Sequence, residues 1–250
     1  MSKRIRTVEV MTTLNEKDFK NLSVNLDQVS LKVQAADVDE IHLYYPVPEK
    51  DSDLEYFQIQ HSVTSGDLTI WEESGTKRRG LFKENINLVG ATEVRVFLPR
   101  STKLDLLDIQ ISMGSSHVEG QRIKDLKADL SMGSLSLIDV EADDITASLS
   151  MGSVSLDRAA LRQGRMDLSM GSLSGYAAFG GHMDLDLSMG SIDLTLRQEE
   201  ERLSYDMDTS MGSIKVAGKK LGSTANYKAD SETAFVEASV SMGSIGLTFD

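Results

Sequence analysis

Three aspartates at equivalent places in a repeated sequence are the first residues that could do chemistry. Asp167, Asp186 and Asp208 each stand two residues before a copy of the phrase Ser-Met-Gly-Ser. Carboxylates that lie close together raise one another's affinity for protons and for hard cations such as Ca²⁺. A cation ladder is therefore one hypothesis for these residues. A solvated acidic face is the alternative that we favour, and we predict no metal site.

A basic cluster is the second candidate, because it stands out in an acidic chain. Lys77, Arg78, Arg79 and Lys83 lie between Glu73 and Gly90, in a segment with the composition of a loop. Such a cluster could bind an acidic segment of a partner protein, or it could be a solvated loop.

Catalytic motifs are weak or missing. The segment 212–219, GSIKVAGK, has one residue too many for a phosphate-binding loop, and Lys220 stands where Ser or Thr is required. The chain has no Gly-x-Ser-x-Gly nucleophile motif, and its 6% aromatic content offers few platforms for sugars. We expect a protein that is not an enzyme, with no catalytic residues and no cofactor.

Charge and composition limit the partners. A formal charge of −13 disfavours nucleic acid, since phosphate backbones require a basic surface. The chain has no cysteine and no apolar run of the length that spans a membrane. Its first residues, MSKRIRTVEVM, lack the apolar core of a signal peptide. The sequence as given predicts a cytoplasmic protein. If it is part of a longer chain, association with the cell envelope is the alternative.

The elements that position these residues are predicted from the repeat. Its seven copies begin at residues 112, 131, 150, 169, 188, 210 and 241, which gives four steps of 19 followed by steps of 22 and 31. Apolar residues alternate before and after each copy, as in strands with one buried face. A glycine after each methionine allows a sharp corner. The pattern predicts an all-β fold, a single-stranded β-solenoid with rungs of about 19 residues.

Stacking of the rungs predicts interior columns of equivalent residues. The first column is Leu130, Leu149, Leu168 and Leu187. The second column is Met132, Met151, Met170, Met189, Met211 and Met242, and the columns of Leu135 and Leu137 follow. The structural residues of the seven copies are Met113, Gly114, Met132, Gly133, Met151, Gly152, Met170, Gly171, Met189, Gly190, Met211, Gly212, Met242 and Gly243. Methionine sulfur could bind a soft metal such as Cu(I), but burial of the column argues against it.

The two ends of the solenoid are expected to differ. Residues 1–100 are predicted to be an irregular β region that caps the first rung, and 101–250 the seven rungs, in one continuous domain. The strand 245–250 ends the chain without a polar cap. We expect the long excursion between Val216 and Ala238 to fold over this last rung. The alternative is an end-to-end homodimer through it.

The chain resembles the DUF4097 family of bacterial proteins, which are often described as candidate adhesins. The resemblance rests on Leu98-Pro99 at the end of a strand and on the repeats that follow, and it covers roughly residues 20–250. Typical members carry Thr-Ser-Ser-Gly-Asp-Ile where this chain has Thr-Ser-Met-Gly-Ser-Ile at 209–214. Methionine for serine and serine for aspartate are departures from the family phrase. The resemblance implies a β-solenoid and supplies no catalytic residues.

These observations favour a non-catalytic scaffold that presents a repetitive surface to other macromolecules. Its expected partner is a protein or a cell-envelope glycan. One alternative is a cytoplasmic regulator of envelope stress that acts by protein contact. The other is a carbohydrate-active or cation-dependent enzyme on the acidic face.

Overall fold

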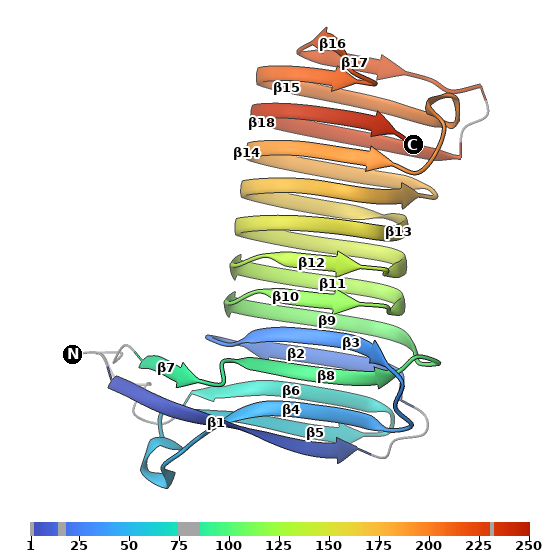
Figure 1. Cartoon of the computed structure of the whole chain (residues 1–250). Coiled ribbons are helices and arrows are strands. Elements are labelled where there is room, and N and C mark those ends of the chain that lie inside the picture. The colour runs from blue at the N-terminus through green and yellow to red at the C-terminus, as the bar shows by residue number, and fades with distance from the viewer. Residues whose placement is uncertain (1–2, 15–18, 75–85, 231–232) are drawn as a thin grey trace.

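The structure is a computed structural model that describes residues 3–14, 19–74, 86–230 and 233–250. The described residues form an all-β protein, as expected, around one large and mostly parallel β-sheet (Figure 1). Among the described residues, the 3-10 helices η1 (Asp51–Asp53) and η3 (Glu200–Arg202) lie in connections between strands. The described part of the chain contains no apolar helix of the length that crossing a membrane requires.

The middle of the sheet is a stack of layers, and each layer is one pass of the chain. Its strands are β9 (Lys103–Met113), β10 (Ser116–Glu119), β11 (Arg122–Met132), β12 (Leu135–Ile138), β13 (Glu141–Phe179) and β14 (His182–Leu196). A layer has a long strand such as β11, a tight corner and a short strand such as β12. Each strand pairs in parallel with its counterpart in the next layer, so that Leu130 lies beside Leu149 and Leu168 beside Leu187.

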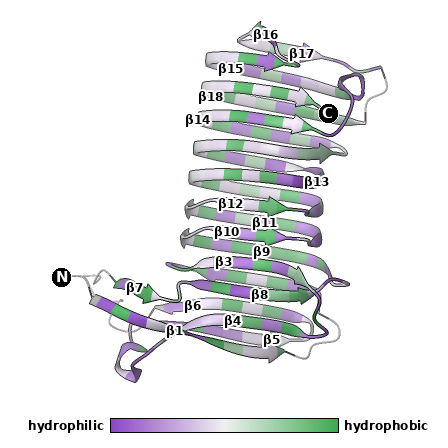
Figure 2. Ribbon diagram, viewed as in Figure 1, coloured by the Kyte–Doolittle hydropathy of each residue, from purple (hydrophilic) through white to green (hydrophobic). Residues whose placement is uncertain are grey.

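The alternating apolar residues meet inside this stack, where the ribbon in Figure 2 alternates between hydrophobic and hydrophilic residues. Three of the predicted columns are buried. The column of Leu130, Leu149, Leu168 and Leu187 is exposed by 3% or less, and so are the columns that contain Leu135 and Leu137. Each side chain of this kind stabilises the fold by roughly 1.5–3 kcal/mol.

The prediction of an interior methionine column is wrong. All seven repeat methionines are exposed, six of them by 39–43% and Met211 by 64%. The chain begins to turn directly after buried Leu130, so that Ser131 and Met132 both face outward before Leu135 returns to the interior. Four residues therefore form the corner, and the strict alternation that placed the methionines inside ends one residue earlier than predicted.

The glycine of each corner has a steric reason. Gly152 has φ +143°, a backbone conformation that residues other than glycine rarely adopt. A Cβ on Gly152 would overlap the carbonyl oxygen of Gly133 in the neighbouring layer, and a Cβ on Gly171 would overlap that of Gly152. The glycines thus allow successive corners to stack with their backbones in contact.

The order of layers changes at the C-terminal end. The strands there are β15 (Leu203–Val216), β16 (Lys219–Gly222), β17 (Thr224–Tyr227) and β18 (Ala234–Phe249). β18 lies between β14 and β15 and is parallel to both (Figure 1). β16 and β17 pair with β15 in antiparallel fashion. The excursion therefore covers β15 rather than the last repeat. Both edges of β18 are paired within the chain, one with β14 and the other with β15. The alternative of an end-to-end homodimer stays a prediction.

The N-terminal part continues the same sheet. Its strands are β1 (Lys3–Leu14), β2 (Asn21–Leu26), β3 (Ser30–Ala36), β4 (Ile41–Pro48), β5 (Phe57–Thr64), β6 (Asp67–Ser74), β7 (Ile86–Gly90) and β8 (Glu93–Pro99). β2 pairs in parallel with β9 and β6, and β3 with β10 and β8. β2 and β3 thus add a layer to the stack, while β1, β4 and β5 form antiparallel pairs. The division near residue 100 remains a prediction.

Candidate functional site

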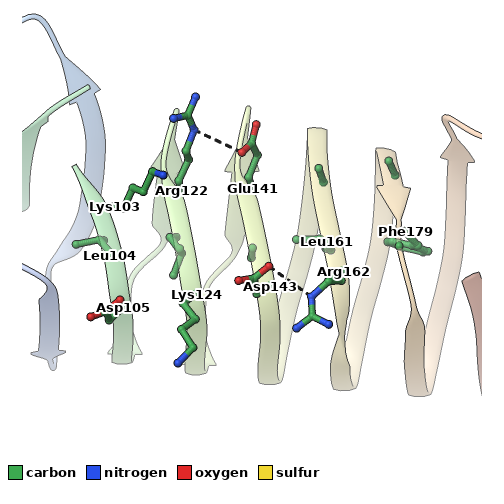
Figure 3. A pocket seen from close by; sticks show the side chains of 15 residues that line it. Lys103, Leu104, Asp105, Arg122, Lys124, Glu141, Asp143, Leu161, Arg162 and Phe179 are labelled. Carbon is green, nitrogen blue, oxygen red and sulfur yellow. Dashed lines mark hydrogen bonds and ion pairs between the residues drawn. The ribbon is translucent and has the colours of Figure 1, made fainter. Parts of the chain in front are cut away.

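A groove of about 590 Å³ runs along the stack where successive long strands begin (Figure 3). Its lining comes from 103–105, 122–124, 141–143, 160–162 and 178–180, which are equivalent segments of five layers. Strand pairing places Leu104 beside Ile123, and Ile123 beside Ala142. The groove is therefore a product of stacking, and it is repetitive along its length.

The floor of the groove is apolar and is formed in part by small side chains. Leu104, Ile123, Leu161 and Phe179 are each exposed by 4% or less. Alanines at 142, 160 and 178 contribute further lining. Ala142 is smaller than Ile123, which lies beside it, and Ala160 stands 19 residues after Glu141, where earlier layers carry long charged side chains. The surface is therefore hollowed at these small residues.

Charged side chains form two rows along the groove. One row holds Lys103, Arg122 and Glu141, and the other holds Asp105, Lys124, Asp143 and Arg162. Within the rows, Arg122 lies 3.4 Å from Glu141 and Arg162 lies 3.4 Å from Asp143 (Figure 3). These pairs are exposed and contribute little to stability. The rows present charges of both signs to a bound molecule.

The three aspartates of the hypothetical cation ladder are not in consecutive layers. Asp167 pairs with Asp186, but Asp186 pairs with Ser239, and Ser239 pairs with Asp208. Since β18 lies between β14 and β15, Ser239 separates Asp208 from the other two. A hollow of about 300 Å³ lies over this region, lined by Asp167, Asp186, Ser239 and neighbouring residues.

A single guanidinium binds the carboxylates of this region. Arg165 Nε donates to both carboxylate oxygens of Asp167 at 2.8 and 2.9 Å. Its Nη1 donates to Asp184 at 2.7 Å, and its Nη2 donates to Asp186 at 2.5 Å. Arg165 thus occupies the place that a cation ladder would need. Nowhere in the described residues do three His, Asp or Glu side chains come together in a way that could hold a metal ion.

Asp186 nevertheless keeps an elevated proton affinity. Burial raises the pKa of Asp186, and the charges of Asp184, Asp167 and Glu237 raise it further, while Arg165 lowers it. Desolvation disfavours the charged carboxylate, and the three neighbouring negative charges add to this effect. Ionised Asp186 is therefore a local source of instability.

Asp186→Asn is expected to increase stability at pH 7, by less than about 1 kcal/mol because a side chain 39% exposed is screened by solvent. The pKa of Asp186 is higher in the folded protein than in the unfolded chain, so protonated Asp186 stabilises the wild type. This stabilisation is complete at pH values below the unfolded pKa and is lost as pH rises through the folded pKa. Asparagine does not titrate, so the advantage should vanish below the ordinary aspartate pKa of 3.8. Thermal melts from pH 3 to pH 7 measure it. A variant less stable than wild type at pH 7 would show that the Arg165 ion pair outweighs desolvation.

The other site residues predicted from sequence divide into two groups. Lys77, Arg78, Arg79 and Lys83 lie outside the described residues. The repeat methionines and glycines line the corners, with the glycines in contact and the methionines exposed. The groove was missed, because its residues precede the repeat phrase and resemble an ordinary solvated strand. The sequence did contain one indication of a hollow surface, which is the pair of small residues Ala142 and Ala160 near the starts of two successive layers.

Fold and groove together define a layered all-β protein with a repetitive, exposed surface. A model of the DUF4097 (Toastrack) family matches residues 19–245, and the chain belongs to this family. No curated protein matches it.

Two solved structures show similarity in fold. A candidate lipid-binding protein from Parabacteroides distasonis is 15% identical with a TM-score of 0.53, and the match covers 99% of this chain and 100% of that one. A candidate adhesin from Bacteroides fragilis is 9% identical with a TM-score of 0.51, covering 98% and 100%. At such identities the similarity establishes the fold alone. None of these matches indicates a catalytic family.

Proposed function

We propose that the stack is a β-solenoid with turns of about 19 residues, and that it serves as a non-catalytic scaffold for binding macromolecules through its groove. The groove across five layers carries this proposal. An open, apolar channel between rows of charge suits a long ligand better than a small molecule, which is usually enclosed in a deep pocket. The family resemblance supports the same class of function.

The chemistry of the groove favours an extended protein segment. Five layers at about 4.8 Å spacing span about 19 Å, the length of about six residues of extended chain. The apolar floor can receive side chains from one face of such a segment. Lys103, Asp105 and Lys124 form no ion pair within the described part of the chain and are free to pair with its charges. Phe179 is the one aromatic residue in the lining, which argues against a glycan.

A displayed library of random peptides tests this function. Peptides selected on wild type are expected to bind Ala160→Trp at least about tenfold more weakly, a loss of about 1.4 kcal/mol, because the indole fills the groove. Ser155→Trp is the matched control, since Ser155 is exposed on the same strand outside the lining. Isothermal titration calorimetry measures both.

The outcome is decisive in either direction. Selected peptides that bind all three proteins equally would place binding elsewhere and overturn the groove. Selection of no peptide, together with groove-dependent retention of cell-wall glycan, would overturn the proposed ligand class. Calcium-dependent turnover of a glycan would favour the enzyme alternative instead.

A further inference from the structure

The exposed methionines form a continuous column on the outside of the stack. In spatial order this methionine ladder is Met113, Met132, Met151, Met170, Met189, Met242 and Met211. The contact between the backbones of Gly152 and Gly171 places Met151 and Met170 in adjacent layers as well. The ladder contains seven of the twelve methionines in the chain. Seven thioethers therefore stand in register on one exposed edge.

Packing does not explain why every layer that carries the Ser-Met-Gly-Ser repeat keeps methionine here. These side chains are 39–64% exposed, so the interior does not require an apolar residue at this position. Three residues earlier, another outward position varies freely, with Gln110, Asp129 and Ser148 in successive layers. The methionine is present in all seven copies. A residue that is exposed, apolar and invariant within the chain points to the chemistry of its sulfur.

We propose that the methionine ladder binds soft monovalent cations of the Cu(I) class between thioethers of adjacent layers. A thioether is a soft ligand that selects such ions over Mg²⁺, Ca²⁺ or Zn²⁺. A metal–sulfur bond of about 2.3 Å, the length of a Zn–thiolate bond, lets one ion between two sulfurs span about 4.6 Å. Parallel strands are about 4.8 Å apart, so the spacing of the stack matches this ligand geometry.

The surroundings of the ladder favour a cation. The phrase Ser-Met-Gly-Ser contains no charged residue, so no positive charge within it repels a cation. Asp129 and Asp208 stand three residues before ladder methionines, in a chain with a formal charge of −13. Negative potential raises the local concentration of cations. Seven thioethers, taken two for each ion, accommodate three ions.

Silver nitrate in chloride-free buffer tests the proposal on the whole protein, with Ag(I) as a probe that does not change oxidation state. Wild type is expected to take up about three ions, observed by native mass spectrometry. A fourfold variant carries Met132→Leu, Met151→Leu, Met170→Leu and Met189→Leu. It leaves Met113 without a neighbouring methionine and keeps one adjacent pair, Met242 and Met211, so it should bind one silver ion. Leucine has nearly the same volume, so the fold should be kept.

Met11→Leu is the matched control, because Met11 is 48% exposed on β1 but stands outside the ladder. Its uptake of silver should equal that of wild type. Anaerobic competition against a chromogenic Cu(I) chelator measures the affinity for Cu(I). This affinity should be at least about tenfold lower for the fourfold variant than for wild type or Met11→Leu. Uptake should be the same at pH 5 and pH 7, because thioethers do not titrate, whereas sites made of His lose ions on protonation.

The ladder can be examined in wild type even if the fourfold variant fails to fold. Methionine methyl NMR should show shifts on silver addition at ladder residues, and none at buried Met166, Met183 and Met207. No uptake by wild type would overturn the proposal. Equal uptake by a folded ladder variant, or loss of uptake at pH 5, would place the ions elsewhere and overturn it as well.

Discussion

Gly152→Ala is expected to lower the free energy of unfolding by about 3–5 kcal/mol, the sum of backbone strain and overpacking. Gly152 has φ +143°, where an alanine is strained regardless of the space around it. Its Cβ would also overlap the carbonyl oxygen of Gly133, which is backbone and cannot rotate away. Relief requires the two layers to separate, and separation weakens their parallel hydrogen bonds and exposes the Leu130 and Leu149 column.

Gly180→Ala is the control for this prediction. A Cβ at Gly180 would meet its nearest neighbours, both in Arg162, at 3.6 and 3.7 Å, which is ordinary van der Waals contact. Its φ lies outside the left-handed range, so the change should alter stability by less than about 0.5 kcal/mol. Denaturation in urea, followed by circular dichroism, compares the two. Equal effects of the two substitutions would show that the glycine column has no special steric role.

The sequence was sufficient to predict the strands and most of the interior. Residues spaced two apart, such as Leu135 and Leu137, identify a strand with one buried face, and the 19-residue step places equivalents side by side. The methionines were misplaced because alternation was extended from Leu130 to Met132. Alternation holds only while the chain is extended, and the corner begins at Ser131. Hydrophobicity alone could not show this, since methionine is tolerated both inside and outside.

The order of layers was beyond the reach of local patterns. β18 carries the same inward residues as the other layers, among them Val240 and Ile245, so its sequence fits any position in the stack. The steps of 22 and 31 residues indicated longer connections after β14 and β15. They did not show that β18 would return to pair with the edge of β14 instead of adding a layer beyond β15. The contacts of Arg165 do not depend on this order, because its layer and the next follow the regular 19-residue step, but local patterns do not show the direction of its side chain. Its carboxylate partners belong to two layers, and only three-dimensional stacking brings them around one guanidinium.

Removal of residues 234–250 is the test of that layer order, and it is expected to release β15 from the stack. β18 pairs with β14 from His182 to Leu196 and with β15 from Leu203 to Val216. It also contributes buried Val236, Val240, Ile245 and Leu247. At roughly 1.5–3 kcal/mol for each of these four side chains, the truncated chain should lose at least about 6 kcal/mol of local stability. β15, β16 and β17 should then lose amide protection in hydrogen exchange, while β9 to β13 keep theirs.

A peptide of residues 234–250, added in trans, is expected to restore protection to β15, and a scrambled peptide of the same composition should not. Restoration follows because binding to the folded partners stabilises them, and the stabilisation grows with the logarithm of peptide concentration. The opposite result is equally informative. If β15 stays protected in the truncated chain, it has closed directly onto β14, as the repeat order predicts, and Asp208 then lies beside Asp186. In that case β18 and β15 compete for the same edge of β14. The layer order then depends on which of the two strands buries more apolar area when it pairs there.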